Sequence, residues 1–254
     1  MTAREPVGVT VVIAARNEAA NITDCIASVS WAREVVVVEN DSTDDTIERA
    51  RAAGAKVMSN DFETIGRQRN AAIEAASSQW ILVVDADERG SPRLGEEVRA
   101  TIAGAAYYAY RVPRRNFFLG SEVRHGGWNR DRPIRLFRSH LRYDASRVHE
   151  HVVVSGDVGE LRSTLSHEPY PSINSYLEKL ERYSLWWAED KYERGKRTGP
   201  ASVWVRSRLR FASMYFLKFG FLDGEAGVIL ASLASMSVMT KYARLWEIQK
   251  RGGQ

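Results

Sequence analysis

The sequence places three carboxylates within four residues, in the run Asp85-Ala86-Asp87-Glu88. They directly follow the apolar run WILVV at residues 80–84, which is typical of a buried strand. Carboxylates two positions apart at a strand end can share a hard divalent cation, which compensates the charge of a diphosphate. An isolated Asp-x-Asp is usually a solvated acidic turn, so the position of this run at a predicted strand end carries the argument.

Two further polar loops follow apolar runs in the same way. AARNE at residues 14–18 ends the first apolar run, and ENDSTDDT starts at Glu39 after a second one. Asn17, Glu18 and Glu39 can reach a base and a ribose, whereas the side chains at residues 42–44 equally fit the capping of a helix N-terminus. The sequence contains neither Gly-x-Gly-x-x-Gly nor Gly-Lys-Ser/Thr, the two glycine-rich phosphate loops.

Strand-like and helix-like segments alternate over residues 1–90, with short connections. Strands are predicted at residues 7–15, 34–39, 55–59 and 80–84, and helices at residues 19–29, 46–53 and 65–76. This alternation predicts an α/β fold with a mostly parallel sheet flanked by helices. Such a sheet binds ligands at the carboxyl ends of its strands, where the three polar loops are expected to meet.

The pattern changes in the second part of the chain. Further strands are predicted at residues 105–112, 135–137 and 152–154, and helices at residues 173–197 and 201–251. No Gly/Ser-rich linker separates these parts. We therefore predict one catalytic domain over residues 1–170, in two parts at 1–90 and 91–170, and a helical C-terminal extension over residues 171–254.

The charge of the chain is divided unevenly. Of 254 residues, 44% are hydrophobic and 27% are charged, which suits a folded protein with a full core. Residues 1–110 carry 11 Lys and Arg against 17 Asp and Glu, whereas residues 111–254 carry 25 against 15, a balance of −6 and +10. The acidic first part argues against a nucleic-acid-binding module and fits a metal site; the basic second part fits an anionic surface or substrate, with chance scatter as the alternative.

Composition also bears on location. The single cysteine, Cys25, excludes an internal disulfide, and the N-terminus lacks a signal-peptide pattern, so we expect a cytoplasmic protein. Residues 204–221 combine aromatic with basic side chains, and the apolar run at 226–239 is shorter than the roughly 20 residues of a membrane span. We expect peripheral binding to an anionic membrane surface, with packing of these helices against the catalytic domain as the alternative.

Four segments, in this order and spacing, resemble the nucleotide-sugar half of glycosyltransferase family 2: AARNEAANITDCIASV, VVVVENDSTDDT, IGRQRNAAIEAA and WILVVDADE. HGGWNRDRPIRLFRS, VHEHV and the C-terminal KFGFLDGEAGVILASLASMSVMTKYARLWE are similar to the branch that includes lipopolysaccharide core-biosynthesis glucosyltransferases. The resemblance covers nearly the whole chain. It implies that residues 1–90 are the nucleotide-sugar half and residues 91–170 the acceptor half of the catalytic domain. It also implies a GT-A fold, a UDP-sugar donor, a Mg²⁺ or Mn²⁺ ion and inversion at the anomeric carbon.

The resemblance also implies roles for residues of the first two loops. Ala15, Asn17 and Glu18 match the first nucleotide loop of the family. Glu39 matches an acidic residue that contacts uracil, although the family usually has Asp there. Asp41 stands where the family usually has Gly, but Asp tolerates a left-handed backbone better than most residues.

The resemblance also implies the metal ligands, whereas the choice of the base comes from the residues of the second half. Asp85 and Asp87 match the DxD motif, with Asp87 expected to bind the metal directly and Asp85 expected to serve both the metal and the nucleotide sugar. Inversion needs a base on the face of the sugar opposite the departing diphosphate. Glu150 is our choice, with Asp131 and Asp144 as alternatives.

An acceptor site is expected near the flexible HGGW loop. An aromatic ring there can stack on a sugar, and arginine forks suit phosphate or carboxylate groups of a lipopolysaccharide inner core. For any one arginine, a surface charge without function is the alternative. The expected acceptor-binding residues are Trp128, Arg130, Asp131, Arg135 and His149.

The sequence thus predicts an inverting glycosyltransferase, peripheral on the cytoplasmic face of the inner membrane. It is expected to move a hexose, glucose from UDP-glucose, to a lipopolysaccharide-core or other lipid-linked acceptor. Two other classes stay open: a sugar nucleotidyltransferase, which usually carries a glycine-rich loop after its first strand, and a catalytically silent nucleotide-sugar-binding protein at the membrane. No nucleic-acid partner is expected.

Overall fold

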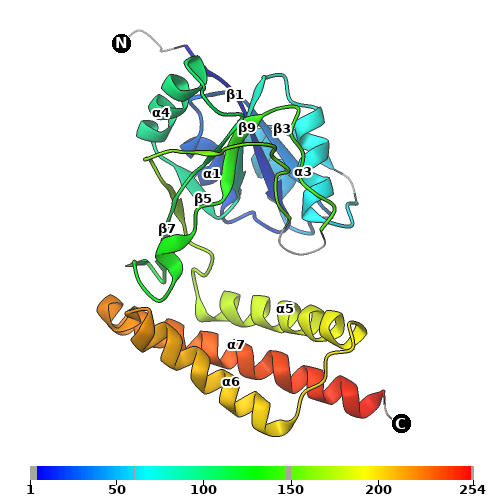
Figure 1. Cartoon of the computed structure of the whole chain (residues 1–254). Helices are drawn as coiled ribbons and strands as arrows, with labels where there is room; N and C mark the ends of the chain where they lie inside the picture. Colours follow the sequence, from blue (N-terminus) through cyan, green and yellow to red (C-terminus); the bar gives the residue numbers. More distant parts are fainter. Residues whose placement is uncertain (1–4, 60, 147–149, 253–254) are drawn as a thin grey trace. The chain divides into compact units, whose positions relative to one another are not determined.

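The fold is described from a computed structural model, which covers residues 5–59, 61–146 and 150–252. The chain forms two compact units: unit 1, residues 1–114 and 131–167, and unit 2, residues 115–130 and 168–254. Figure 1 shows a sheet with helices in unit 1 and three long helices in unit 2. The division at residue 170 into a catalytic domain and an extension stays a prediction about independently folding domains.

A seven-stranded sheet forms the centre of unit 1, in the order β10-β6-β9-β4-β1-β2-β3. Adjacent strands among β4, β1, β2 and β3 are parallel, whereas β9 is antiparallel to both of its neighbours. The strands are β1 (Val7–Ala15), β2 (Ala32–Glu39), β3 (Lys56–Ser59), β4 (Trp80–Asp85), β6 (Ala109–Arg111), β9 (Ile134–Arg138) and β10 (Gly159–Glu160). The predicted α/β fold with a mostly parallel sheet is confirmed.

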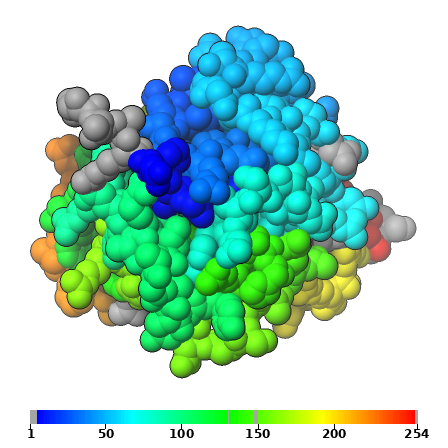
Figure 2. Space-filling view, turned by 90° about the horizontal axis from the view of Figure 1, so that it is seen from above, coloured from blue at the N-terminus to red at the C-terminus, as the bar shows by residue number. Residues whose placement is uncertain are grey.

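Helices cover both faces of this sheet. The β-branched run of β1 is buried on both sides, with Val11 and Ile13 in the core that also holds residues of α1 (Ile22–Ser28), α2 (Thr46–Ala52) and α4 (Pro92–Ala103). Val12 lies in the opposite core with residues of α3 (Ile65–Glu74). In Figure 2 the dark-blue start of the chain lies between blue-to-cyan residues on one side and green ones on the other, as expected for a central strand.

A short strand pair in unit 1 lies next to the end of β4. β5 (Glu88–Gly90) pairs antiparallel with β11 (Leu165–His167), and this register puts Glu88 opposite His167. Neither strand was predicted. The predicted strand at 152–154 was wrong, since Val152 forms only an isolated bridge with Tyr143, and the strand predicted at 105–112 is limited to β6.

Unit 2 combines a hairpin with helices. Residues of β7 (Arg114–Phe118) and β8 (Ser121–Val123) pair through a two-residue turn in which Leu119 and Gly120 both have positive φ. Phe118 and Val123 share a core with residues of the helical part. That part consists of α5 (Ile173–Glu193), α6 (Pro200–Ala212), a π-helical turn η2 (Ser213–Leu217), a 3₁₀ turn η3 (Gly220–Asp223) and α7 (Gly224–Arg251).

The C-terminal helix is longer than its apolar run. The sequence gives 14 apolar and small residues at 226–239, whereas α7 spans 28 residues. Residues Gly220–Arg251 are long and apolar enough to cross a membrane by length and composition, and 17% of their most apolar window is buried. The helix is therefore longer than the apolar run from which peripheral binding was predicted, and peripheral binding stays a prediction.

Candidate active site

Three strand ends bring the polar loops of the sequence to one edge of the sheet. β1 is parallel to β2 and to β4, and the register pairs Ala15 with Glu39 and Ala14 with Asp85. The loops after these strands therefore start side by side. This is the edge at which an open parallel sheet binds ligands.

The first two loops bind each other. Asn17 has φ of 55° and accepts a hydrogen bond from the Thr43 backbone N–H over 2.8 Å, while the Glu18 N–H donates to the Thr46 hydroxyl over 2.8 Å. Asp44 accepts hydrogen bonds from the backbone N–H groups of Ala19 and Thr46, so it joins the loops as well as preceding α2. These bonds fix the loop that the resemblance assigns to the nucleotide.

The acidic residue assigned to uracil lies inside this loop pair. Glu39 is 2% exposed, and its side chain accepts a hydrogen bond from the Ser42 backbone N–H. Asp41 has φ of 56°, a left-handed conformation in place of the usual glycine. The turn after β2 therefore keeps its shape without glycine.

Asp85, the last residue of β4, is held by three arginines. Arg69 of α3 donates to Oδ1, whereas Arg114 over 2.9 Å and Arg135 of β9 donate to Oδ2. All three arginine side chains are at most 13% exposed. Burial alone would raise the pKa of the Asp85 carboxyl, but Arg135, Arg69 and Arg114 outweigh burial and hold this pKa well below its usual range. Asp85 is therefore a charged, paired carboxylate.

Glu88 continues the same buried charge cluster. Its side chain is fully buried and accepts hydrogen bonds from Arg114 Nε, from Arg135 Nη2 over 3.2 Å and from the Asp85 N–H over 2.8 Å. A buried carboxylate needs such partners, because an unpaired one would cost several kcal/mol. The cluster includes three arginines and four carboxylates: Arg69, Arg114 and Arg135 with Asp85, Glu88, Asp131 and Glu150.

Two of the three candidate bases reach this cluster. Glu150 Oε1 accepts a hydrogen bond from Arg69 Nη1, so one guanidinium group holds Glu150 and Asp85 together. Asp131 Oδ2 accepts from Arg114 over 3.0 Å. The third candidate, Asp144, is half-buried and accepts a hydrogen bond from the Ser146 backbone N–H over 3.1 Å.

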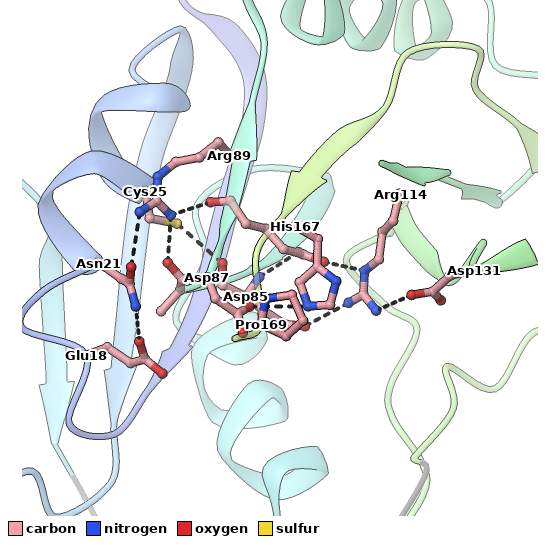
Figure 3. A network of polar contacts seen from close by, with 12 residues as sticks. Glu18, Asn21, Cys25, Asp85, Asp87, Arg89, Arg114, Asp131, His167 and Pro169 are labelled. Carbon is pink, nitrogen blue, oxygen red and sulfur yellow. Dashed lines mark hydrogen bonds and ion pairs between the residues drawn. The ribbon is translucent and has the colours of Figure 1, made fainter. Parts of the chain in front are cut away.

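Asp87 and His167 form the second polar pair of the site. Asp87 Oδ1 lies 3.7 Å from His167 Nε2, with side-chain exposures of 17% and 14% (Figure 3). Burial lowers the pKa of the imidazole, and the neighbouring Asp87 opposes this shift only in part. The neutral imidazole is the form that binds metals.

Asp87 and His167 carry atoms that can bind a divalent cation. Among the described residues, no group of three or more His, Cys, Asp or Glu is placed to hold a metal ion. Asp87 and His167 supply one oxygen and one nitrogen, and two ligands of one cation at about 2 Å each lie roughly 3 Å apart, near the observed separation. The pair therefore fits a cation whose other ligands come from outside the protein.

The predicted acceptor residues that the structure describes are divided between the two units. Arg135 is 3% exposed and belongs to the buried charge cluster, as Asp131 does through Arg114. Trp128 lies in unit 2, where its ring packs against Tyr170 at 6.3 Å between centroids. His149 and the side chain of Arg130 lie outside the described residues.

Sequence reasoning missed several members of the site. Arg69 stands in the quoted segment IGRQRNAAIEAA without a role, although an arginine on the buried face of a helix signals a buried anion. Arg114 was predicted only as one of the arginines around the HGGW loop that suit acceptor phosphate or carboxylate groups, and Glu88 only as part of the acidic run. Nothing local marks His167, because the pairing of β5 with β11 joins residues far apart in sequence.

The sequence and the fold define a glycosyltransferase. Residues 10–156 match the family described as glycosyl transferase family 2, which is more than half of the chain. The chain belongs to glycosyltransferase family 2. This confirms the family, the enzyme class and the GT-A fold class expected from the sequence.

Two relatives match over most of their length. The lipopolysaccharide core biosynthesis glycosyltransferase LpsC of Rhizobium meliloti is 28% identical over 243 residues, which cover 89% of this chain and 90% of the relative. An uncharacterized glycosyltransferase of Rickettsia typhi is 29% identical over 252 residues, covering 92% of this chain and 86% of the relative. The similarity to both relatives therefore extends beyond residues 10–156.

Solved structures match a smaller part. Glucosyl-3-phosphoglycerate synthase from Mycobacterium tuberculosis, solved with Mn²⁺, UDP and glucosyl-3-phosphoglycerate, is 26% identical, with a TM-score of 0.37 and 43% coverage of each chain. Mannosyl-3-phosphoglycerate synthase from Rubrobacter xylanophilus is 23% identical, with a TM-score of 0.39 and coverage of 42% of this chain and 40% of that one. The chain spans less than half of the length of these solved structures.

Proposed function

We propose that this glycosyltransferase moves a hexose, glucose from UDP-glucose, to a lipopolysaccharide-core or other lipid-linked acceptor with inversion at the anomeric carbon. The acceptor class is supported by the match to LpsC over 89% of the chain. The observation that carries the proposed chemistry is the shared guanidinium group of Arg69, because it holds Glu150 beside Asp85.

The loops after β1 and β2 are proposed to bind the nucleotide. Ala15, Asn17 and Glu18 line the first loop, and Glu39 lies on the neighbouring strand end. The hydrogen bonds between the loops support this role, since a preformed loop pair loses little conformational freedom when a ligand binds. Asp85 is proposed to face the nucleotide sugar from β4.

Asp87 is proposed to bind Mg²⁺ or Mn²⁺ directly, with His167 as a second ligand. Asp85 is proposed to serve the same ion as well as the nucleotide sugar. The cation, when bound, offsets the negative charge of the diphosphate. His167 Nε2 and Asp87 Oδ1 face each other at 3.7 Å, which supports a shared ligand. Asp85 is charged, and its three arginines keep its position fixed.

Glu150 is proposed as the base. The acceptor oxygen forms a bond to the anomeric carbon as the bond from that carbon to the diphosphate oxygen breaks, and Glu150 takes the hydroxyl proton. Arg69 is proposed to hold Glu150 in the right orientation. Asp131 remains the first alternative, because Arg114 holds it at the same cluster. Trp128, Arg130, Asp131, Arg135 and His149 stay proposed acceptor contacts.

The protein is proposed to act in the cytoplasm, on the surface of the inner membrane. Residues 204–221 carry Arg206, Arg208, Arg210 and Lys218, and no acidic residue, so an anionic leaflet attracts this segment. An acceptor on that leaflet would then be within reach of the enzyme.

The test of the proposed function is release of UDP from UDP-glucose with and without a truncated lipopolysaccharide-core acceptor. We expect acceptor-dependent release that EDTA abolishes and Mg²⁺ or Mn²⁺ restores. The Asp87→Asn variant should lose most turnover, whereas Asp157→Asn, a change at an exposed loop residue, should match the wild type. Full activity in EDTA or in Asp87→Asn would remove the metal assignment, and UDP release that ignores every acceptor would remove the transfer assignment.

A further inference from the structure

The connection between α6 and α7 exposes an unusual number of large apolar side chains. We call residues 216–222 the aromatic tip (orange in Figure 1). Its five large apolar side chains are 44% to 75% exposed: Phe216, Leu217, Phe219, Phe221 and Leu222. Scattered exposed apolar residues are normal, but a contiguous group of this kind typically marks an interaction surface.

The backbone of the aromatic tip is built to hold this shape. The α6 helix passes into a π-helical turn, and Phe219 then takes a φ of 58°, which a bulky residue rarely adopts. Behind the turn, Gly220 and Gly227 allow a close backbone approach, because a Cβ on Gly227 would lie 1.9 Å from the Gly220 carbonyl oxygen. Met214 is buried beneath the turn. The apolar side chains therefore point outward from a packed support.

The aromatic tip is also joined to the HGGW loop of the same unit. Asp223 accepts hydrogen bonds from the backbone N–H groups of Arg124 and His125, over 3.1 and 2.8 Å. The Gly126 N–H donates to the Lys218 carbonyl oxygen over 2.8 Å. The position of the tip therefore fixes the position of residues 124–126, next to Trp128.

Basic residues lie before and within the aromatic tip in the sequence. Residues 198–222 contain four basic residues and no acidic one. The two acidic residues that follow are Asp223, a buried carboxylate bound to His125, and the exposed Glu225. Within the described part of the chain, none of Arg206, Arg208, Arg210 and Lys218 forms an ion pair. Aromatic and aliphatic side chains beside unpaired cations match the interface of an anionic bilayer, where rings lie at the headgroup level and cations meet lipid phosphates.

We propose that the aromatic tip inserts into the interfacial layer of an anionic bilayer and so holds the HGGW loop at the membrane surface. Insertion itself does not depend on catalysis; the benefit for a lipid-linked acceptor rests on the proposed function. The tip adds an apolar anchor to the electrostatic attraction of the basic residues. Insertion is therefore expected to persist in part at high salt, which screens only the charges.

Flotation of the full-length protein with vesicles tests the insertion. The vesicles contain phosphatidylethanolamine and phosphatidylglycerol, with phosphatidylcholine vesicles as the uncharged comparison. The double change Leu217→Glu with Leu222→Glu should lower the partition coefficient about 100-fold, because two apolar side chains no longer leave water and two negative charges are repelled. The matched control is Leu177→Glu with Leu185→Glu on α5, where the leucines are 41% and 40% exposed; it should bind as the wild type does.

A second measurement reports on depth and does not rely on the loss of binding. An environment-sensitive fluorophore is attached after the Leu217→Cys change; the native Cys25 is buried and does not compete for the label. The emission of the fluorophore at position 217 should shift to shorter wavelength on the anionic vesicles, and nitroxide-labelled lipids should quench this emission. Wild-type binding by the Leu217→Glu, Leu222→Glu variant, or an unshifted fluorophore on bound protein, would overturn the proposal. Neither readout involves turnover, so the proposal of insertion does not depend on whether the proposed glycosyl transfer is correct.

Discussion

In unit 1, arginines and carboxylates are buried among one another, whereas in unit 2 aromatic and aliphatic side chains lie exposed beside unpaired cations. Arg135 is 3% exposed and Glu88 is fully buried, but Leu217 is 75% exposed. Buried charge is costly unless paired, and exposed apolar surface carries a risk of aggregation. Neither arrangement maximises the stability of the fold. The difference fits a division of labour, in which unit 1 binds a small anionic donor and unit 2 binds an extended surface.

Breaking the buried charge cluster should have the largest effect on stability. Arg135→Met leaves Asp85 and Glu88 without one of their partners, and removing one member of a buried ion pair costs about 3–5 kcal/mol. The matched change Arg132→Met removes an exposed pair with Glu160, for which about 0–1 kcal/mol is expected. Urea denaturation of both variants measures the free energy of unfolding. An equal loss of unfolding free energy in the two variants would mean that the buried cluster contributes no more to stability than an exposed ion pair.

Removing the proposed base should lower the rate without weakening donor binding. Glu150→Gln keeps size and hydrogen bonding but cannot accept the proton, so we expect kcat to fall by about 100-fold or more with little change in UDP-sugar affinity. Asp131→Asn is the comparison, since Asp131 is bound to the same cluster through Arg114. Steady-state kinetics and titration with UDP measure the two effects. Normal turnover in Glu150→Gln, with a loss in Asp131→Asn, would move the role to Asp131.

Acid should weaken unit 1 through Asp85. Its pKa is lower in the folded protein than the unfolded value of about 3.9, so its stabilising contribution is present above about pH 4 and is lost as the pH falls toward the folded pKa. One such group changes the free energy of unfolding by up to about 1.4 kcal/mol per pH unit in that range. Denaturant titrations at pH 6, 4 and 3 should show a steeper loss for the wild type than for Asp85→Asn. Parallel profiles would argue against this linkage.

Local pattern was sufficient to predict the sheet and its loops. The first strand was predicted at residues 7–15 and observed at Val7–Ala15, because a β-branched run buried on both faces has few alternatives. The ends of the next strands and the turn at Asp41 also follow from residues near in sequence. These local features alone predict that Asp85 and Glu39 lie at one edge of the sheet.

Long-range pairing was beyond local pattern. His167 lies beside Asp87 only because β11 pairs with β5, and Arg135 reaches Asp85 only because β9 is antiparallel to β4. Three-residue strands carry too little periodicity to be recognised. Local pattern likewise did not predict that Arg135 belongs to a buried charge cluster. The exposure of the aromatic tip likewise depends on a π-helical turn that no residue type announces.

The division of labour between the two units is tested most directly by two variants measured in two assays. Asp87→Asn changes unit 1, and the combined Arg206→Glu, Arg208→Glu and Arg210→Glu change removes three cations of unit 2, each worth about 1 kcal/mol at an anionic surface. We predict that Asp87→Asn loses turnover but floats with anionic vesicles as the wild type does. The triple variant should be released from vesicles, most clearly at low salt, but should keep its turnover on a short soluble acceptor. If the triple variant lost turnover on that acceptor, or if Asp87→Asn no longer floated, the two roles would not be separable and the account would be contradicted.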